Sequence, residues 1–145
     1  MALSLRVPLA LGGALLLLSA CSDNSTADAL IGPEGGQVVH DDGVTLIVPP
    51  GALSTVHQII IRPSDEKLSR GSFEQVGGSY LIEPRILQFK IPAQLTFDRT
   101  VKEKATVLLK PGETRVIAYS TADGKPTAYI GSLGIVAAAK AGDPV

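Results

Sequence analysis

The 145-residue chain has one cysteine and no tryptophan, and aromatic residues make up only 4% of it. A single cysteine excludes an intramolecular disulfide. Basic and acidic residues number 13 and 14, giving a net charge of −1. Nucleic-acid binders usually concentrate basic residues on one face, so no nucleic-acid partner is expected. No run of like charges exceeds two residues, and this excludes a partner recognised by a block of charge.

Long hydrophobic runs are also scarce. The longest, residues 8–18, is too short to cross about 30 Å of hydrocarbon, which takes about 20 helical residues. It follows Arg6 and leads into Leu18-Ser19-Ala20-Cys21. A short positive segment, an apolar segment and small residues before a cleavage point are the parts of a signal peptide. Residues 1–20 are therefore predicted to be a cleaved export signal.

The four residues Leu18-Ser19-Ala20-Cys21 resemble the lipobox of bacterial lipoproteins: a leucine, two small residues, then cysteine. The resemblance implies that the Cys21 thiol receives a diacylglyceryl group, that the chain is cut just before Cys21, and that the new amino terminus is acylated, for example with palmitate. Two or more acyl chains hold a protein firmly at a bilayer, whereas one binds only marginally. An ordinary secretory signal with an incidental cysteine is the alternative.

Ser22 follows the lipidation position, where an aspartate would tend to retain a lipoprotein in the inner membrane. The resemblance therefore implies a lipid anchor in the bacterial cell envelope, at the outer membrane, with the chain facing the periplasm or the cell surface. Residues 21–30 are predicted to be a flexible polar tether. Residues 31–140 are predicted to form one domain and residues 141–145 a polar tail.

Glycine (15) and proline (10) occur throughout the chain, which favours short strands joined by turns. From residue 31 onward, apolar residues alternate with polar ones at a period of two. Asp41-Asp42-Gly43 separates residues 37–39 from residues 44–48 and predicts a hairpin. A second hairpin is predicted around residues 122–125, between residues 116–119 and 127–130.

Other segments carry strand signals of different kinds. The unbroken apolar run of residues 59–61 predicts a strand at the centre of the core, and residues 105–109 alternate. The clearest alternation runs from Leu87 to Phe97, and Pro92 within it requires an edge position or a bulge. Residues 63–79 are predicted to form a long loop with one helical turn near residues 65–68.

The last apolar segment is residues 133–139. Eight or so short strands without a helical stripe predict an all-β fold, a single antiparallel β-sandwich.

Two parts of the chain resemble one known family. The first comprises I-G-P-E-G-G-Q-V at residues 31–38 and G-V-T-L-I-V-P-P-G-A-L at residues 43–53; the second runs from Y-L-I-E-P at residue 80 to P-A-Q-L-T-F ending at residue 97. They resemble the ZU-type domain, the β-sandwich of zonula occludens scaffolds, Unc-type netrin receptors and ankyrins, which also occurs in bacterial lipoproteins. The resemblance covers residues 31–110 and implies a structural or protein-interaction role.

Some members of that family cleave themselves at a His-Phe-Ser sequence. This chain has none, and no histidine precedes Ser132 near its end, so that activity is not expected. Nucleophilic catalysis also needs a base beside the nucleophile. The chain has two histidines, His40 and His57, and no Gly-x-Ser-x-Gly motif. Ser79, which follows Gly77-Gly78, is interpreted as a loop residue.

The local cluster with metal-ligand chemistry is His40-Asp41-Asp42. Aspartate is favoured in turns for its geometry alone, so no metal or other cofactor is predicted; a weak Ca²⁺ site at Asp41 and Asp42 stays open. Two acids on predicted strands, Glu83 and Asp98, could form a glycosidase pair only if the fold brought them together.

Three tyrosines at strand positions could form a sugar-stacking surface: Tyr80, Tyr119 and Tyr129. Such tyrosines are more often half-buried packing residues. The sequence thus favours a non-enzymatic, membrane-anchored structural or interaction module in the cell envelope, with a protein or an envelope polymer as partner. The alternatives are a carbohydrate- or peptidoglycan-binding module, and a hydrolase whose site is assembled from distant residues.

Overall fold

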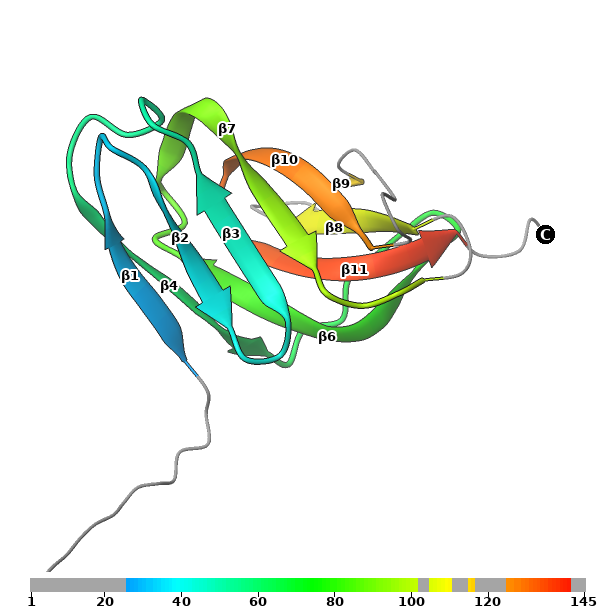
Figure 1. The fold of residues 1–145 in the computed structure, drawn as a ribbon. Coiled ribbons are helices and arrows are strands. Elements are labelled where there is room, and N and C mark those ends of the chain that lie inside the picture. Colours follow the sequence, from blue (N-terminus) through cyan, green and yellow to red (C-terminus); the bar gives the residue numbers. More distant parts are fainter. Residues whose placement is uncertain (1–25, 102–104, 111–114, 117–124, 142–145) are drawn as a thin grey trace, which may run out of the picture.

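A computed structural model describes residues 26–101, 105–110, 115–116 and 125–141. These residues form strands and turns without any helix, which confirms the predicted all-β class (Figure 1). The described part of the chain accordingly holds no helix able to span a membrane. The predicted export signal and Cys21 lie outside it.

The described strands form two antiparallel sheets. The large sheet contains, in spatial order, β1 (Ala27–Ile31), β4 (His57–Ser64), β6 (Phe73–Glu83), β11 (Ile135–Ala141), β8 (Ala105–Lys110) and β9 (Arg115–Val116), with β5 (Ser69–Arg70) paired to β6. The small sheet contains β10 (Thr127–Ser132), β7 (Gln88–Phe97), β3 (Val44–Val48) and β2 (Gly36–His40).

The two sheets pack face to face over a shared apolar core, in a sandwich-like arrangement (Figure 1). Period-two alternation turns every second side chain of each strand toward this core. The small sheet contributes Val38, Leu46, Leu95 and Ile130, and the large sheet contributes Ile59, Ile61, Ile82, Val107 and Val136. The predicted central position of residues 59–61 is confirmed, since Ile59 and Ile61 are fully buried.

The β2–β3 hairpin is confirmed, with Asp41-Asp42-Gly43 as its loop. Gly43 has a φ of +91°, and its N–H donates to the His40 carbonyl at 2.9 Å. Three-residue hairpin loops need a left-handed residue at this position, which glycine adopts without strain.

The predicted tether is too long at its carboxyl end. Residues 27–31 form β1, which pairs with β4 over five residues, so only residues 22–26 separate Cys21 from the first strand. Ile31 is buried, and Ala27 and Ala29 pack against the core. The alternation is too short and its side chains too small to be recognised in the sequence alone.

The loop predicted for residues 63–79 is also wrong. β4 continues to Ser64 and β6 begins at Phe73, while residues 65–68 form no helical turn. Gly77, at a φ of +79°, lies where two extra residues of β6 bulge between its pairings with β11. The bulge breaks the alternation of β6 and so hides the strand in the sequence.

β8 is buried on both faces, unlike a strand with one face in water. Leu108 belongs to a second apolar cluster on the outer side of the large sheet, with Ile135, Ala137, Ala139 and Leu68. Two hydrogen bonds hold the segment around Leu68 against β6. The Leu68 N–H donates to Gln75 Oε1 at 2.7 Å, and the Ser79 hydroxyl donates to the Glu66 carbonyl at 2.5 Å. Ser79 is therefore a strand residue that pins a covering segment.

The second predicted hairpin is wrong where it is described. Val116 pairs with Leu108 in the large sheet, whereas β10 pairs with β7 in the small sheet. Residues 117–124 lie outside the described residues. The last apolar segment, residues 133–139, leads into β11, which begins at Ile135 and lies between β6 and β8.

Pro92 lies in a bulge of β7, as predicted. Ala93 pairs with Ile130 and Gln88 pairs with Ser132, so β7 has three extra residues between these two positions. The bulge changes the side of the sheet to which the side chains of its residues point. Ile91 shares its parity with Phe89 and Ala93, but it is 46% exposed while those two are buried.

Candidate functional site

Three polar side chains meet where the β2–β3 hairpin approaches β6. The Asp42 N–H donates to His40 Nδ1 at 3.1 Å. The Tyr80 hydroxyl donates to Asp42 Oδ2 at 3.1 Å. The rings of Tyr80 and His40 meet edge to face at 5.3 Å. The three residues thus connect the small sheet to the large one.

Burial raises the pKa of the Tyr80 hydroxyl above its ordinary value of 10.0, because desolvation disfavours the phenolate. The hydrogen bond to Asp42 and the negative charge of that carboxylate act in the same direction, while the charge of Arg99 opposes them. Tyr80 is therefore a protonated donor at neutral pH, and this arrangement suits a structural link.

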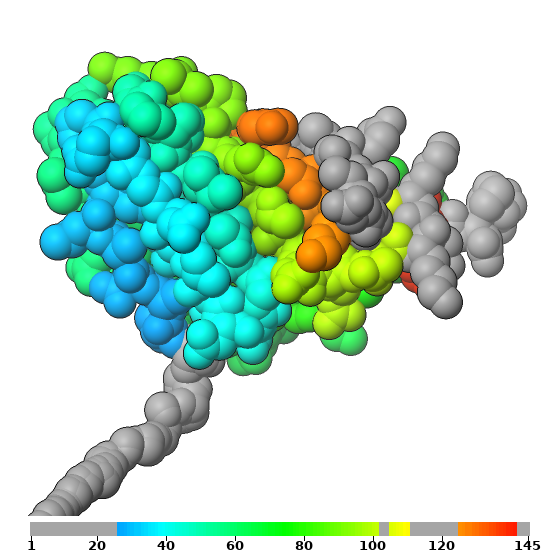
Figure 2. Space-filling view, viewed as in Figure 1, coloured from blue at the N-terminus to red at the C-terminus, as the bar shows by residue number. Residues whose placement is uncertain are grey.

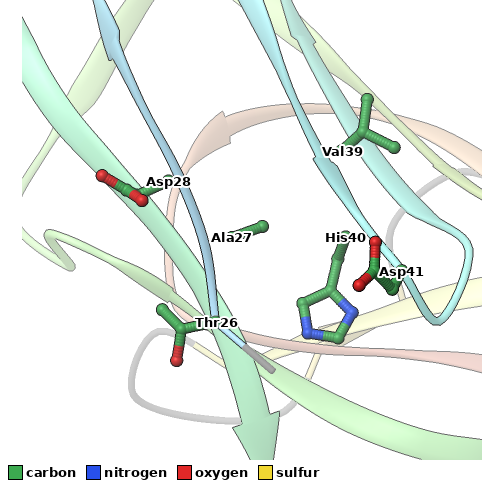
Figure 3. Close-up of a pocket in the computed structure, with 6 residues that line it drawn as sticks. All are labelled: Thr26, Ala27, Asp28, Val39, His40 and Asp41. Carbon is green, nitrogen blue, oxygen red and sulfur yellow. The ribbon is translucent and has the colours of Figure 1, made fainter. Parts of the chain in front are cut away.

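A pocket of about 310 Å³ lies between β1 and β2, the edge strands of the two sheets (Figure 3). It is lined by Thr26, Ala27, Asp28, Val39, His40 and Asp41. The side chain of Ala27 points toward His40, whereas Asp28 points away from the pocket (Figure 3). Asp28 instead accepts a hydrogen bond from Gln58 at 2.8 Å.

The acids around this pocket do not assemble a metal centre with His40. Within the described ranges, no three His, Cys, Asp or Glu side chains lie close enough together to hold a metal ion. Asp41 and Asp42 therefore gain no third such ligand among the residues described.

The other residues with catalytic chemistry are dispersed. His57 Nε2 lies 3.1 Å from the Thr55 hydroxyl on the surface. Glu83 pairs with Arg62 at 2.5 Å, and Asp98 pairs with Lys125 at 2.6 Å.

These two acids belong to different parts of the fold. Glu83 ends β6 of the large sheet, and Asp98 follows β7 of the small sheet. Glu83 and Asp98 therefore do not form the glycosidase pair that the sequence left open. Ser132 ends β10 opposite Gln88.

The row of stacking tyrosines is not formed by the two that are described. Tyr80 is 9% exposed and faces the core, whereas Tyr129 is 60% exposed on the outer side of the small sheet. Tyr119 lies outside the described residues. The prediction of a sugar-stacking surface that includes both Tyr80 and Tyr129 is therefore wrong.

The outer side of the small sheet is a surface that sequence reasoning missed. Eight of its outward side chains form two rows across the strands: Gln37, Ile47, Gln94 and Tyr129 in one, and Val39, Thr45, Thr96 and Thr127 in the other. None of the eight carries a charge, although charged residues make up 19% of the chain. The strands that carry them lie toward the viewer in Figures 1 and 2.

One end of this surface is hollowed. The hollow has a volume of about 370 Å³ and is lined by Ile47, Pro49, Ile91, Pro92, Gln94 and Tyr129. The bulge at Pro92 brings Ile91 into this lining. We call the eight residues of the two rows, together with this hollow, the neutral face. Its uncharged positions were visible in the sequence, but their alignment into rows depends on strand order.

Comparison with known proteins leaves the chain without an assigned family. No protein-family model matches it, and no curated protein matches it.

Proposed function

We propose that this chain is a lipoprotein of the bacterial cell envelope, anchored by acyl chains on Cys21, and that its β domain is a non-catalytic structural or interaction module. The outer membrane is the proposed location, because Ser22 follows the lipidation position. The partners are the bilayer, through the lipid, and a protein or polymer of the envelope.

The observation that carries this proposal is the short distance along the chain between Cys21 and the folded domain. β1 begins at Ala27, six residues after Cys21. At about 3.5 Å per residue, this segment reaches about 20 Å when extended. An anchor at Cys21 would hold the domain beside the bilayer without burying any of its strands.

We propose further that the domain is a ZU-type module, on the sequence resemblance alone. Gly35 has a φ of +81° in the turn after β1, and the Gly51 N–H donates to the Pro33 carbonyl at 2.9 Å. Within the first of the two segments that carry the resemblance, residues 33–35 thus form a tight turn and Gly51 belongs to the corner packed against it. These are structural roles, and the described contacts of Ser79 and His40 are structural as well.

Metabolic labelling with a radioactive fatty acid tests the anchor. Wild-type chain expressed in a didermal bacterium should carry the label, and Cys21→Ser should carry none, because the hydroxyl does not replace the thiol that the diacylglyceryl group requires. The variant should be retained as the longer precursor or released without lipid.

Ser22→Asp is the matched control, because it keeps the thiol and should be labelled like wild type. It should also fractionate with the inner membrane instead of the outer. Equal labelling of wild type and Cys21→Ser would refute the anchor.

A further inference from the structure

We infer that the neutral face lies against the bilayer that holds the anchor, so that the domain rests on the membrane through its small sheet. This inference rests on the lipid anchor proposed above and adds a second, non-covalent contact with the same membrane. The contact would be with the boundary between headgroups and acyl chains.

The absence of charge on the neutral face is the first argument. Transferring a charged group out of water costs far more than transferring an amide or a hydroxyl. All eight side chains of the two rows are neutral, and so is the whole lining of the hollow. The eight residues and the hollow can therefore approach a lipid interface without desolvating a charge of their own. The exposed Lys90 of the same sheet lies in the bulged segment of β7, and a lysine there can keep its ammonium group in water along its long side chain.

The apolar groups on the face are the second argument. Val39, Ile47, Ile91 and Tyr129 are between 40% and 60% exposed. Isoleucine and valine gain free energy on leaving water, and tyrosine prefers the level of the headgroups, where its ring is apolar and its hydroxyl stays hydrated. The threonines and glutamines between them can donate hydrogen bonds to lipid ester and phosphate oxygens.

The position of the tether is the third argument. Thr26, Ala27 and Asp28 line a pocket together with Val39, so the chain enters the domain beside the edge of the neutral face (Figure 3). From the strand of Val39 the face extends over three more strands, which is about 15 Å at a spacing of about 4.8 Å. A tether reaching about 20 Å spans this width.

The outer side of the large sheet does not offer the same surface. It carries Asp28 on β1, and the ion pair of Arg62 with Glu83 on β4 and β6. Laying this side on lipid would desolvate charged groups. Of the two sheets, the small one is therefore the side that faces the membrane.

The chain allows a direct test, because Cys21 is its only cysteine and it contains no tryptophan. The chain from Cys21 onward holds every described residue. Its thiol is coupled to a maleimide phospholipid in phosphatidylcholine vesicles, and a single tryptophan is introduced by Tyr129→Trp. Brominated phosphatidylcholine quenches only those tryptophans that enter the bilayer.

Leu30→Trp is the matched control, since Leu30 is 74% exposed and lies on β1 of the large sheet. Leu30 is only three residues from Ala27, so proximity to the anchor alone would favour its quenching. We expect at least about twofold stronger quenching for Tyr129→Trp, with a blue-shifted emission, as for an aromatic residue at the interface. Adding Ile47→Lys and Ile91→Lys to Tyr129→Trp should abolish the difference while the circular dichroism stays that of a β protein.

Equal quenching at both positions, stronger quenching at Leu30→Trp, or none at either would overturn the inference. So would dimerisation of the uncoupled chain that is lost on Ile47→Lys, because the face would then belong to a second copy. Chemical coupling makes the result independent of acylation in cells. A failed fatty-acid label would thus defeat the anchor separately from the docking measurement.

Discussion

At the scale of single residues, Tyr80 joins the two sheets. Its hydroxyl donates to Asp42 in the β2–β3 hairpin, and its ring contacts His40 and Phe97 of the small sheet. The sequence predicted Tyr80 to be in a strand, but it could not show which side of the strand faced the core. Packing between the sheets decides this side, and it brings the Tyr80 hydroxyl to Asp42, which is 38 residues away in the chain.

Tyr80→Phe should lower the free energy of unfolding by about 1 kcal/mol at pH 8, because one hydrogen bond to a carboxylate is lost. The raised pKa adds a pH dependence. Since the folded pKa exceeds 10.0, the unfolded state loses its proton first, and the contribution of Tyr80 is fully present below pH 10 and declines as the pH rises through the folded value.

The stability difference between wild type and Tyr80→Phe should therefore shrink between pH 8 and pH 11, as measured by urea unfolding. Tyr129→Phe at the exposed tyrosine is the control and should change stability by less than about 0.5 kcal/mol at pH 8. A Tyr80→Phe difference that stayed constant over this range would contradict the assignment.

Position 35 requires a glycine, because its backbone is left-handed and no side chain fits there. A Cβ there would lie 2.6 Å from the Val48 carbonyl oxygen and 2.8 Å from the Pro50 nitrogen, at a φ of +81°. Gly35→Ala should cost about 3 kcal/mol, from the left-handed backbone and the clash together.

Gly71 is the matched control, because its φ is +60° and nothing lies within 4 Å of an added Cβ. Gly71→Ala should cost about 1 kcal/mol, for the backbone alone. Thermal unfolding followed by circular dichroism measures both. Equal losses would show that the close approach at Gly35 is relieved by a small shift.

At the scale of elements, β1 and the bulge in β7 differ in what the sequence reveals. Pro92 lacks the N–H that strand pairing needs, so local chemistry predicts an edge position or a bulge there, and the pairing of β7 with β10 makes it a bulge. β1 has no such signal. In the sequence alone, Ala27 and Ala29 cannot be told from the residues of a tether. Only the pairing with β4 shows that they belong to a strand.

Truncation separates the tether from β1. A chain that begins at Ala27 should be as stable as one that begins at Ser22. A chain that begins at Gly32 should lose about 3 kcal/mol or more, because it loses the buried Ile31 and uncovers the β4 side chains paired with β1. Urea unfolding of the three chains decides this, and equal stability of all three would mean that β1 adds nothing to the fold.

At the scale of the whole molecule, the short distance between the domain and the predicted anchor limits which surfaces the domain can contact. With the proposed lipid on Cys21, a tether of about 20 Å would keep the domain at an effective concentration on the order of millimolar beside the bilayer. Under that condition, even a weak preference of one face fixes an orientation. The neutral face, lying next to the entry of the tether, is the face that this geometry favours.

The sequence by itself determined the features that depend on neighbours along the chain. These are the all-β class, the β2–β3 hairpin, the interruption of strand pairing at Pro92 and the Leu18-Ser19-Ala20-Cys21 motif on which the anchor prediction depends. The all-β class follows from the period-two alternation, and the hairpin follows from its glycine turn. The interruption at Pro92 follows from its missing N–H, and the anchor prediction follows from the four residues that end at Cys21. None of them requires knowledge of which strands are neighbours in space.

Only the tertiary structure decided the features that depend on strand order. It made β1 a strand, placed residues 73–79 in β6, separated Tyr80 from Tyr129, and aligned eight neutral side chains across four strands. The physical reason is that period-two alternation gives each strand two faces without saying what covers either of them. Packing between the sheets selects the buried face, and pairing between strands turns separate neutral residues into one surface.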